Sequence, residues 1–318
     1  MADGRFERVA ILGLGLVGGS VALAARERRA AGTVVGTGRR RDALDDAVRR
    51  GLIDATATIE RAVEAADLVI LATPVTAMAA QLRRAASHLR PGTLVTDVGS
   101  VKGLPAETLP GLLPPGVPYV GSHPMAGSHL RGVEHARGDL FVDAPCVVTA
   151  TPDTDPRAVE RIAAFWERLG ARVVHRGPVE HDAEVAWVSH VPHVLAFAFA
   201  RSLVAAPETA GRLGGSGFRD FTRIAQSDAE LWSDILVANA KSIAGPLREV
   251  AEELRHFAVD LESGDVEALE SSIAQARSVL ARTLAAARED DSNARSGGEY
   301  PEIQAAPEAA TPKGKKNE

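Results

Sequence analysis

The chain has 318 residues, of which 45% are hydrophobic and 25% are charged, and its formal net charge is −6. This length exceeds the usual size of one hydrophobic core, so we expect about two domains. The acidic balance gives no basic footprint for nucleic acid, which we exclude as a partner.

The cysteine content and the hydropathy of the chain indicate the cellular compartment in which we expect the protein. The single cysteine, Cys146, cannot form an internal disulfide, and the opening MADGRFERVA contains no apolar run of the signal type. The most apolar stretch, 194–206, is interrupted by Arg201 and is shorter than the roughly 20 residues that a spanning helix needs. We therefore expect a cytoplasmic protein with no membrane segment.

The first half of the chain alternates short β-branched runs with alanine-rich stretches of helical pattern. The expected strands are 8–15, 33–38, 67–74, 93–100, 119–124, 146–152 and 171–177, and the clearest helices are 20–32, 41–51 and 158–170. Such alternation requires crossover connections, which predict a doubly wound parallel sheet with helices on both faces. We place this α/β domain at 1–178.

After residue 178 the strand pattern stops. The segment 179–288 is almost continuously helical in pattern, with breaks at 205–218 and 261–268, and predicts a second, all-α domain. The end of the chain, 289–318, is polar, rich in Pro and Gly and without periodicity, so we expect a disordered tail.

A glycine-rich loop follows the first expected strand. ILGLGLVGGS has the GxGxxG spacing, in which glycines permit a tight turn, close approach of the backbone to a pyrophosphate and close packing of the next helix. The motif alone is weak, but here it joins a strand to an alanine-rich helix, as dinucleotide binding requires. We predict a Rossmann-like domain whose cofactor loop consists of Gly13, Leu14, Gly15, Leu16, Val17 and Gly18.

The end of the second strand bears on the choice between NAD and NADP. An acid there usually accepts hydrogen bonds from the adenosine ribose, whereas this chain has Gly38 followed by Arg39 and Arg40. Guanidinium groups suit a 2′-phosphate, so NADP is weakly favoured, with a solvated helix start as the alternative. A later strand ends in ATPV, where Thr73 and Pro74 would lie beside the cofactor.

Two polar residues follow neighbouring strands. Ser100, in TDVGSVKG, and His123, in YVGSHPMAGSHLRG, both fall at the carboxyl edge of the sheet, where open α/β folds bind ligands. The near-neutral pKa of histidine suits it to take a proton from a hydroxyl, and a serine can orient the ring or the substrate. An unremarkable loop histidine is the alternative. A serine hydrolase is disfavoured because GSVKG lacks the GxSxG elbow.

The helical domain offers two further clusters. WVSHVPH places His190 and His193 three apart at a proline-marked helix start, and without HExxH or a carboxylate partner we expect substrate contact or helix packing and no metal. GSGFRDFTRIAQSD places Arg219 and Arg223 four apart. One of these arginines could bind a carboxylate through two hydrogen bonds, and two surface arginines are the alternative.

Together, GLGLVGGS, TDVGSVKG, GSHPMAGS, WVSHVPH and GFRDFTRIAQSD, in this order and over about residues 8–285, resemble the prephenate and arogenate dehydrogenases of tyrosine biosynthesis. The resemblance implies NAD(P)-dependent oxidative decarboxylation of prephenate to 4-hydroxyphenylpyruvate, or of arogenate to tyrosine. It also implies a homodimer formed through the helical domain.

The resemblance assigns roles to individual residues. His123 matches the catalytic histidine that accepts the proton of the ring hydroxyl, and Ser100 matches the serine that hydrogen-bonds this hydroxyl and the histidine. Arg223 matches the arginine that binds the ring carboxylate. His193 matches a histidine near the substrate, and we include His190, from the same motif, in the substrate site.

The chain departs from the family at His129, where most relatives carry an acid soon after HPMAG. This change leaves open whether the accepted side chain is keto or amino. The segment after the helices is too short and too polar for a regulatory domain. The alternatives are another dehydrogenase with a helical second domain, an enzyme for an amino-substituted prephenate, and a non-catalytic dinucleotide sensor.

Overall fold

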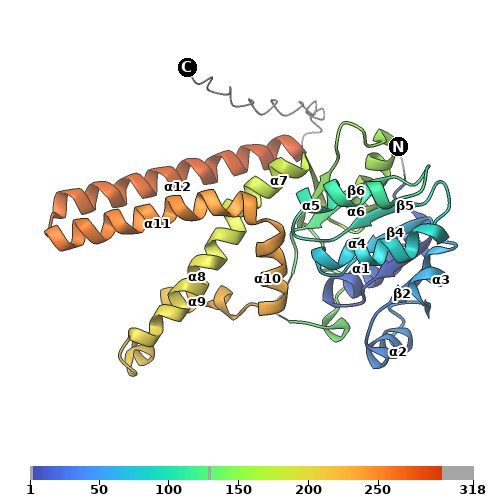
Figure 1. The fold of residues 1–318 in the computed structure, drawn as a ribbon, viewed down its shortest axis with the longest axis horizontal. Helices are drawn as coiled ribbons and strands as arrows, with labels where there is room; N and C mark the ends of the chain where they lie inside the picture. Colours follow the sequence, from blue (N-terminus) through green and yellow to red (C-terminus); the bar gives the residue numbers. More distant parts are fainter. Residues whose placement is uncertain (1–2, 128–129, 296–318) are drawn as a thin grey trace, which may run out of the picture.

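The computed structural model describes residues 3–127 and 130–295, so the expectations for His129 and for most of the tail fall outside the described residues. Two domains follow one another, an α/β domain and an elongated helical domain (Figure 1). The strands are β1 (Phe6–Leu12), β2 (Ala31–Thr37), β3 (Ala55–Thr56), β4 (Leu68–Leu71), β5 (Leu94–Asp97), β6 (Tyr119–Pro124), β7 (Pro145–Thr149) and β8 (Arg172–Arg176).

The strands form one sheet in the order β3-β2-β1-β4-β5-β6-β7-β8. All the neighbouring pairs are parallel except β6 and β7, which are antiparallel. The predicted Rossmann-like sheet is confirmed, and the expectation of a wholly parallel sheet is corrected at β7. In its described part, the β6–β7 connection contains only a short 3-10 turn, Val133–His135, and no crossover helix, so β7 runs back along β6.

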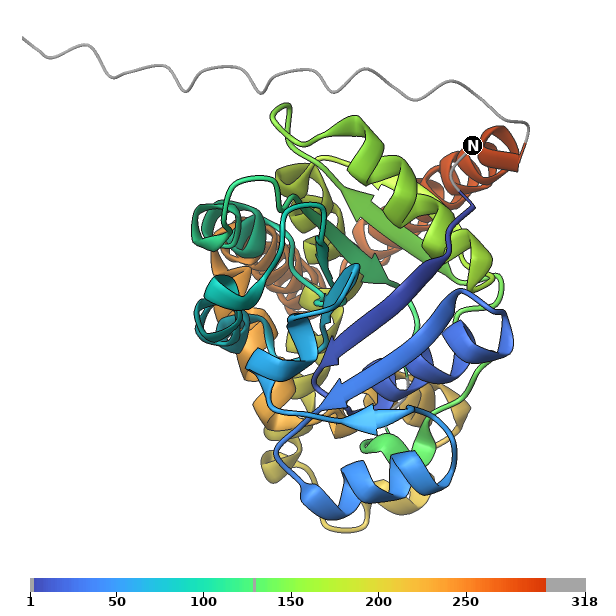
Figure 2. The ribbon, with the colours of Figure 1, turned by 90° about the vertical axis from the view of Figure 1, so that its right-hand side faces the viewer.

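Helices cover both faces of the sheet (Figure 2). They are α1 (Leu16–Glu27), α2 (Arg41–Arg49), α3 (Ile59–Val63), α4 (Val75–Ala85), α5 (Gly103–Thr108) and α6 (Pro156–Arg168). In β1, Val9 and Ile11 belong to the core shared with α1, α2 and α6, whereas Ala10 and Leu12 belong to the core shared with α3 and α4. This alternation follows from the two-residue period of a strand and makes β1 apolar on both sides.

The second domain contains α7 (Pro178–Val185), α8 (Val191–Ser202), α9 (Ser216–Arg223), α10 (Ala229–Ala238), α11 (Ala240–Ser263) and α12 (Val266–Arg295). A wide π-helical turn, Ala186–His190, joins α7 to α8 just before Pro192, which has no N–H to donate. Further 3-10 turns are Ala86–His88, Pro110–Leu112, Leu203–Ala205, Ala210–Leu213 and Ile224–Gln226. The all-α domain is thus confirmed.

The long helices α11 and α12 form a hairpin that projects from the rest of the molecule (Figure 1). Gly264, with φ +68°, ends α11 in the left-handed conformation that favours glycine. The helix α12 then continues to Arg295, beyond residue 288, where we expected the tail to begin. This part of the tail is therefore helical in the structure.

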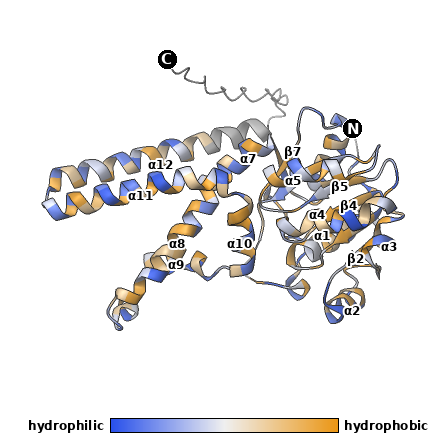
Figure 3. Ribbon diagram, in the orientation of Figure 1, coloured by the Kyte–Doolittle hydropathy of each residue, from blue (hydrophilic) through white to orange (hydrophobic). Residues whose placement is uncertain are grey.

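Hydrophobic residues recur along the helices of the second domain (Figure 3). Many of their large side chains are exposed in the single chain. By length and composition alone, Pro178–Ala205 is apolar enough to cross a membrane. The first half of this stretch carries His181, Asp182 and His190, all of which are buried.

Candidate active site

The glycine loop connects β1 to α1. Gly13 has φ +112°, and a Cβ there would lie 2.5 Å from the Ala72 carbonyl oxygen, so the turn requires glycine. A Cβ on Gly18 would lie 2.1 Å from the Gly13 carbonyl oxygen, which explains how α1 starts so close to the strand. A Cβ on Gly15 would meet nothing within 4 Å, so the space over the loop is open.

The start of α1 is suited to an anion. Gly15 is its N-cap and supplies no side-chain hydrogen bond, so the first backbone N–H groups of the helix remain to bind a pyrophosphate. The side chains of Leu14 and Val17 pack against the core, and Leu16 is buried. The loop therefore presents backbone to a cofactor, as a dinucleotide requires.

At the end of β2, Gly38, Arg39 and Arg40 are exposed. The Arg40 Nη2 atom lies 2.9 Å from Asp42 Oδ2. The hydrogen bond that Arg40 donates to Asp42 is the main cause that raises the pKa of Arg40. Ion pairs this exposed are weak, so a phosphate could replace Asp42 as the partner of Arg40.

Thr73 and Pro74 lie between β4 and α4. The Thr73 hydroxyl donates a hydrogen bond to Gln81 Oε1 at 3.1 Å, and Pro74 is the N-cap of α4. The other domain supplies a cap for this helix, because Asp234 in α10 accepts a hydrogen bond from the Val75 backbone nitrogen. The two domains are thus joined beside the predicted cofactor site.

His123 lies near the end of β6 and is buried. Its Nδ1 atom is 2.8 Å from His181 Nε2, and His181 Nδ1 is 2.8 Å from Asp182 Oδ1. The Asp182 carboxylate also accepts hydrogen bonds from the backbone nitrogens of Lys102 and Gly103, at 2.7 and 2.8 Å. A buried chain of three side chains, His123, His181 and Asp182, therefore joins β6 to α7.

The surroundings of His123 favour its neutral form. Burial lowers the pKa of His123 well below its ordinary value, and the nearby His181, Lys102 and His190 lower it further. A neutral imidazole can accept a proton, so His123 has the protonation state that a base needs.

A buried ion pair lies behind this histidine. Lys102 Nζ pairs with Asp97 and donates to the Ser122 carbonyl oxygen at 2.7 Å, and the Tyr119 hydroxyl donates to Asp97 Oδ1 at 2.8 Å. Burial lowers the pKa of Lys102, which Asp97 opposes. Because Ser122 precedes His123 in β6, this pair supports the backbone that carries the histidine.

Ser100 follows β5 and is half-buried. Among the described residues, its hydroxyl makes no hydrogen bond to His123, whose Nδ1 is occupied by His181. The predicted bond between Ser100 and the substrate hydroxyl stays a prediction.

The helical domain places His190 inside the protein. His190 Nδ1 is 3.0 Å from Asn239 Nδ2, which also donates to the Asp182 backbone oxygen at 2.9 Å. Burial lowers the pKa of His190 to about 4. These contacts favour the packing alternative for His190 over direct contact with a substrate.

His193 and Arg223 lie near one another. The His193 ring stacks on Trp232, with centroids 3.6 Å apart, and its Nδ1 donates to the Ser189 carbonyl oxygen at 2.8 Å. Burial lowers the pKa of His193, and the charge of Arg223 adds to this effect, which the Ser189 carbonyl opposes. Arg223 ends α9 and is exposed, so its guanidinium can meet an anion.

Two further features lie around this centre. Arg131, in the loop after β6, forms an ion pair with Asp228 at the start of α10 and so joins the two domains.

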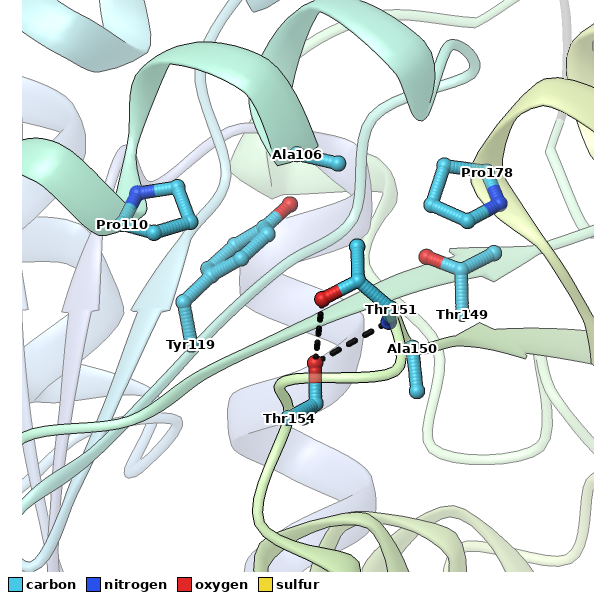
Figure 4. A pocket seen from close by; sticks show the side chains of 8 residues that line it. All are labelled: Ala106, Pro110, Tyr119, Thr149, Ala150, Thr151, Thr154 and Pro178. Atoms are coloured by element: carbon cyan, nitrogen blue, oxygen red, sulfur yellow. Dashed lines mark hydrogen bonds between the residues drawn. The ribbon is translucent and has the colours of Figure 1, made fainter. Parts of the chain in front are cut away.

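A small pocket is lined by residues that include Tyr119, Thr151 and Thr154 (Figure 4). The hydroxyl oxygens of Thr151 and Thr154 are 3.1 Å apart. It contains none of the predicted cofactor or substrate residues, so we assign no ligand to it.

The sequence patterns did not identify His181, Asp182, Lys102 or Trp232 as parts of the site. The only sequence signal for the first two was a His-Asp pair at the start of the helical domain. As a whole, the arrangement can bind a dinucleotide at the glycine loop, hold an anion at Arg223 and take a proton at His123.

Comparisons with known proteins agree with this division of the chain. Residues 21–175 match the family model described as prephenate dehydrogenase, nucleotide-binding domain, and 177–275 match the model described as prephenate dehydrogenase, dimerization domain. The boundary between the matches lies close to the predicted boundary at residue 178.

Individual relatives cover most of the chain. The prephenate dehydrogenase of Bacillus subtilis is 34% identical over 83% of this chain and 72% of its own. The cyclohexadienyl dehydrogenase of Zymomonas mobilis is 34% identical over 82% of this chain and 90% of its own. The crystal structure of prephenate dehydrogenase from A. aeolicus with hydroxyphenyl propionate and NAD+ has a TM-score of 0.80 and 30% identity, and covers 87% of this chain and 97% of that chain.

Proposed function

Because the chain belongs to the prephenate dehydrogenase family, we propose that it catalyses the oxidative decarboxylation of prephenate or arogenate in tyrosine biosynthesis. The observation that carries the proposal is a buried, neutral His123 at the carboxyl edge of a sheet whose first loop is built for a dinucleotide. A proton acceptor beside a nicotinamide site is what oxidation of a ring bearing a hydroxyl group requires.

His123 accepts the proton of the ring hydroxyl in this proposal. The hydride leaves the carbon that bears the hydroxyl, the bond between the ring and its carboxylate breaks, and carbon dioxide leaves. The electron pair of that bond makes the ring aromatic, and the ring oxygen takes the proton back from His123 to form the phenol. A nicotinamide dinucleotide, when bound, supplies the hydride acceptor. The protein therefore has to orient the ring and remove one proton, and neither task needs a metal.

Arg223 and His193 are the proposed substrate contacts. The substrate carries two carboxylates, and the exposed guanidinium of Arg223 can form a charge-assisted pair with one of them. The stack on Trp232 and the bond to Ser189 hold the His193 ring in one orientation, which suits a residue that positions a ligand. We propose that Ser100 hydrogen-bonds the ring hydroxyl. We propose that His190 does not contact the substrate directly and packs against Asn239 behind the site.

The cofactor is a nicotinamide dinucleotide, and we propose NADP over NAD. Support comes from the exposed Arg39 and Arg40 at the end of β2, where no acid follows directly. The open space over Gly15 and the uncapped start of α1 fit the pyrophosphate. Arg40 would have to exchange Asp42 for the phosphate.

We also propose a cytoplasmic homodimer. The second domain matches a dimerization domain, and large apolar side chains along α8, α11 and α12 are exposed in the single chain. Among them are Phe199, Leu254, Leu261, Ile273 and Leu280. A second copy that covers these side chains would bury a surface too apolar to remain in water.

Steady-state assays test the function directly. Purified protein should reduce NADP or NAD with prephenate or arogenate, which is measured by the near-ultraviolet absorbance of the reduced nicotinamide. It should release one molecule of carbon dioxide for each molecule of dinucleotide reduced. Binding of the dinucleotide without turnover on either substrate would contradict the proposal and support a non-catalytic sensor.

A further inference from the structure

The hydrogen-bonded side chains of His123, His181 and Asp182 determine which ring nitrogens of the two histidines carry protons. The distances from His123 Nδ1 to His181 Nε2 and from His181 Nδ1 to Asp182 Oδ1 are both 2.8 Å, and the two rings meet edge to face. All three side chains are at most 8% exposed, so water has little access to these contacts. Each contact must therefore have one donor and one acceptor.

The Asp182 carboxylate determines the direction of its hydrogen bond with His181. A carboxylate oxygen accepts hydrogen bonds, and every hydrogen-bond partner of the Asp182 carboxylate among the described residues is an N–H group. His181 Nδ1 therefore carries a proton. A Cβ at Gly103 would lie 2.8 Å from Asp182 Oδ2, so glycine at this position lets the carboxylate reach the start of α5.

We propose that His181, oriented by Asp182, is a positioning residue that holds His123 in the tautomer with the proton on Nδ1 and the lone pair on Nε2. In neutral His181 with its proton on Nδ1, the Nε2 atom can only accept, so His123 Nδ1 has to donate. The free lone pair of His123 then lies on Nε2, the nitrogen that His181 does not occupy. The proposal rests on the proposed function only in naming the hydroxyl proton as what Nε2 receives.

The titratable groups around His123 bear on the charge of its ring. Lys102 at the start of α5 already places an ammonium group nearby, balanced by Asp97 of β5. His190 lies on the π-helical turn, and the buried Cys146 lies on β7. Burial, with the charge of Lys102 as a further cause, lowers the pKa of His123, so this ring is neutral when it donates from Nδ1.

The arrangement matters most once the proton has moved. When His123 Nε2 takes the hydroxyl proton, the resulting imidazolium still donates from Nδ1 to His181, and Asp182 lies beyond it as the counter-charge. The ring needs no rotation, because its two nitrogens already have their partners. With the opposite tautomer, Nε2 would carry a hydrogen and could not act as the base.

Nitrogen-15 NMR of the full chain labelled in its histidines tests the proposal without substrate. We expect a protonated Nδ1 and an unprotonated Nε2 for His123 at neutral pH, with its signals assigned by their loss in His123→Asn. A protonated Nε2 in the unmodified protein would overturn the proposal. This readout does not depend on turnover, so a fixed tautomer in a protein inactive on both substrates would sink the proposed function alone.

Two substitutions separate tautomer control from simple packing. His181→Gln keeps an oxygen that can accept from His123 Nδ1, whereas His181→Leu has no acceptor. We expect His181→Leu to mix the two tautomers of His123 and to lower kcat at least about tenfold, with the KM for the dinucleotide unchanged. His181→Gln should restore much of the single tautomer and much of kcat. His88→Gln, on the surface of the first domain, is the matched control. Unchanged tautomer and kcat in His181→Leu would refute the role, and if that variant does not fold, the spectra of the unmodified protein and of His181→Gln decide.

Discussion

The Asp234 carboxylate in the helical domain accepts a hydrogen bond from the backbone nitrogen of Val75 in the first domain, at 2.7 Å. The same carboxylate also accepts from the Thr76 nitrogen. An acid from one domain therefore caps α4 of the other, directly after Thr73 and Pro74. Because the proposed cofactor residues lie in the first domain and the proposed carboxylate-binding Arg223 lies in the second, this cap helps to determine the distance between them.

Asp234→Ala should cost about 1 kcal/mol of stability, as the loss of a helix cap usually does, and should also lower kcat/KM. Asp155→Ala is the matched control, since Asp155 caps α6 within the first domain, far from the site. We expect a similar fall in Tm for both variants but altered kinetics only for Asp234→Ala. Equal kinetics in the two would show that the contact between Asp234 and α4 is merely structural.

His123→Asn should keep the fold and cofactor affinity while kcat falls by about 10²-fold or more, because the base is lost. In the unmodified enzyme, kcat/KM should decline as the pH falls through the pKa of His123, because protonation removes the acceptor. Burial lowers this pKa, so the decline should begin below the ordinary histidine range. A pH profile that bends above about 6.5, the ordinary histidine pKa, would contradict this assignment.

Arg223→Ala should raise the KM for the substrate roughly tenfold or more, since a charge-assisted pair with a carboxylate is worth about 1.5–3 kcal/mol. Arg219→Ala is the control, because Arg219 lies on the same helix and donates to the Gly214 carbonyl oxygen at 2.8 Å. If Arg219→Ala has the larger effect, the carboxylate is bound there instead.

Replacing Arg39 and Arg40 by alanine should weaken NADP by roughly tenfold or more and leave NAD nearly unchanged, because the pyrophosphate site at the glycine loop is intact. Arg49→Ala, at the other end of α2, is the control. Dissociation constants from fluorescence titration measure the effect. Equal losses for both cofactors, or an unmodified enzyme that prefers NAD, would refute the proposed selectivity.

The exposed apolar side chains of the helical hairpin, α11 and α12, should form the dimer interface. The unmodified protein should have the mass of a dimer in light scattering, and Leu254→Glu with Leu280→Glu should shift it toward the monomer, because charges cannot be buried there without partners. Val142→Glu, an equally apolar exposed position in the first domain, should remain dimeric. A monomeric unmodified protein at micromolar concentration would contradict the proposal.

The sequence by itself determined the order of the elements, and it predicted the edge of the sheet at which we propose the chemistry. Strand and helix periodicities and the turn at Gly13 are encoded within a few neighbouring residues, so they can be recognised without the fold. Because the carboxyl ends of parallel strands meet at one edge, Ser100 and His123 could be placed there from their positions after two strands. The antiparallel β7 escaped this reasoning, since a strand has the same pattern in either direction.

Only the tertiary structure decided which side chains meet. His181 lies 58 residues after His123, and Asp234 lies 159 residues after Val75, and no local pattern links such positions. Their contacts depend on how α7 and α10 pack against the first domain. The buried pair of Lys102 and Asp97 was not predicted for a related reason, because charged residues are usually exposed. Packing brings these distant groups together, and their mutual geometry is the basis of our proposal that His123 is oriented as a base.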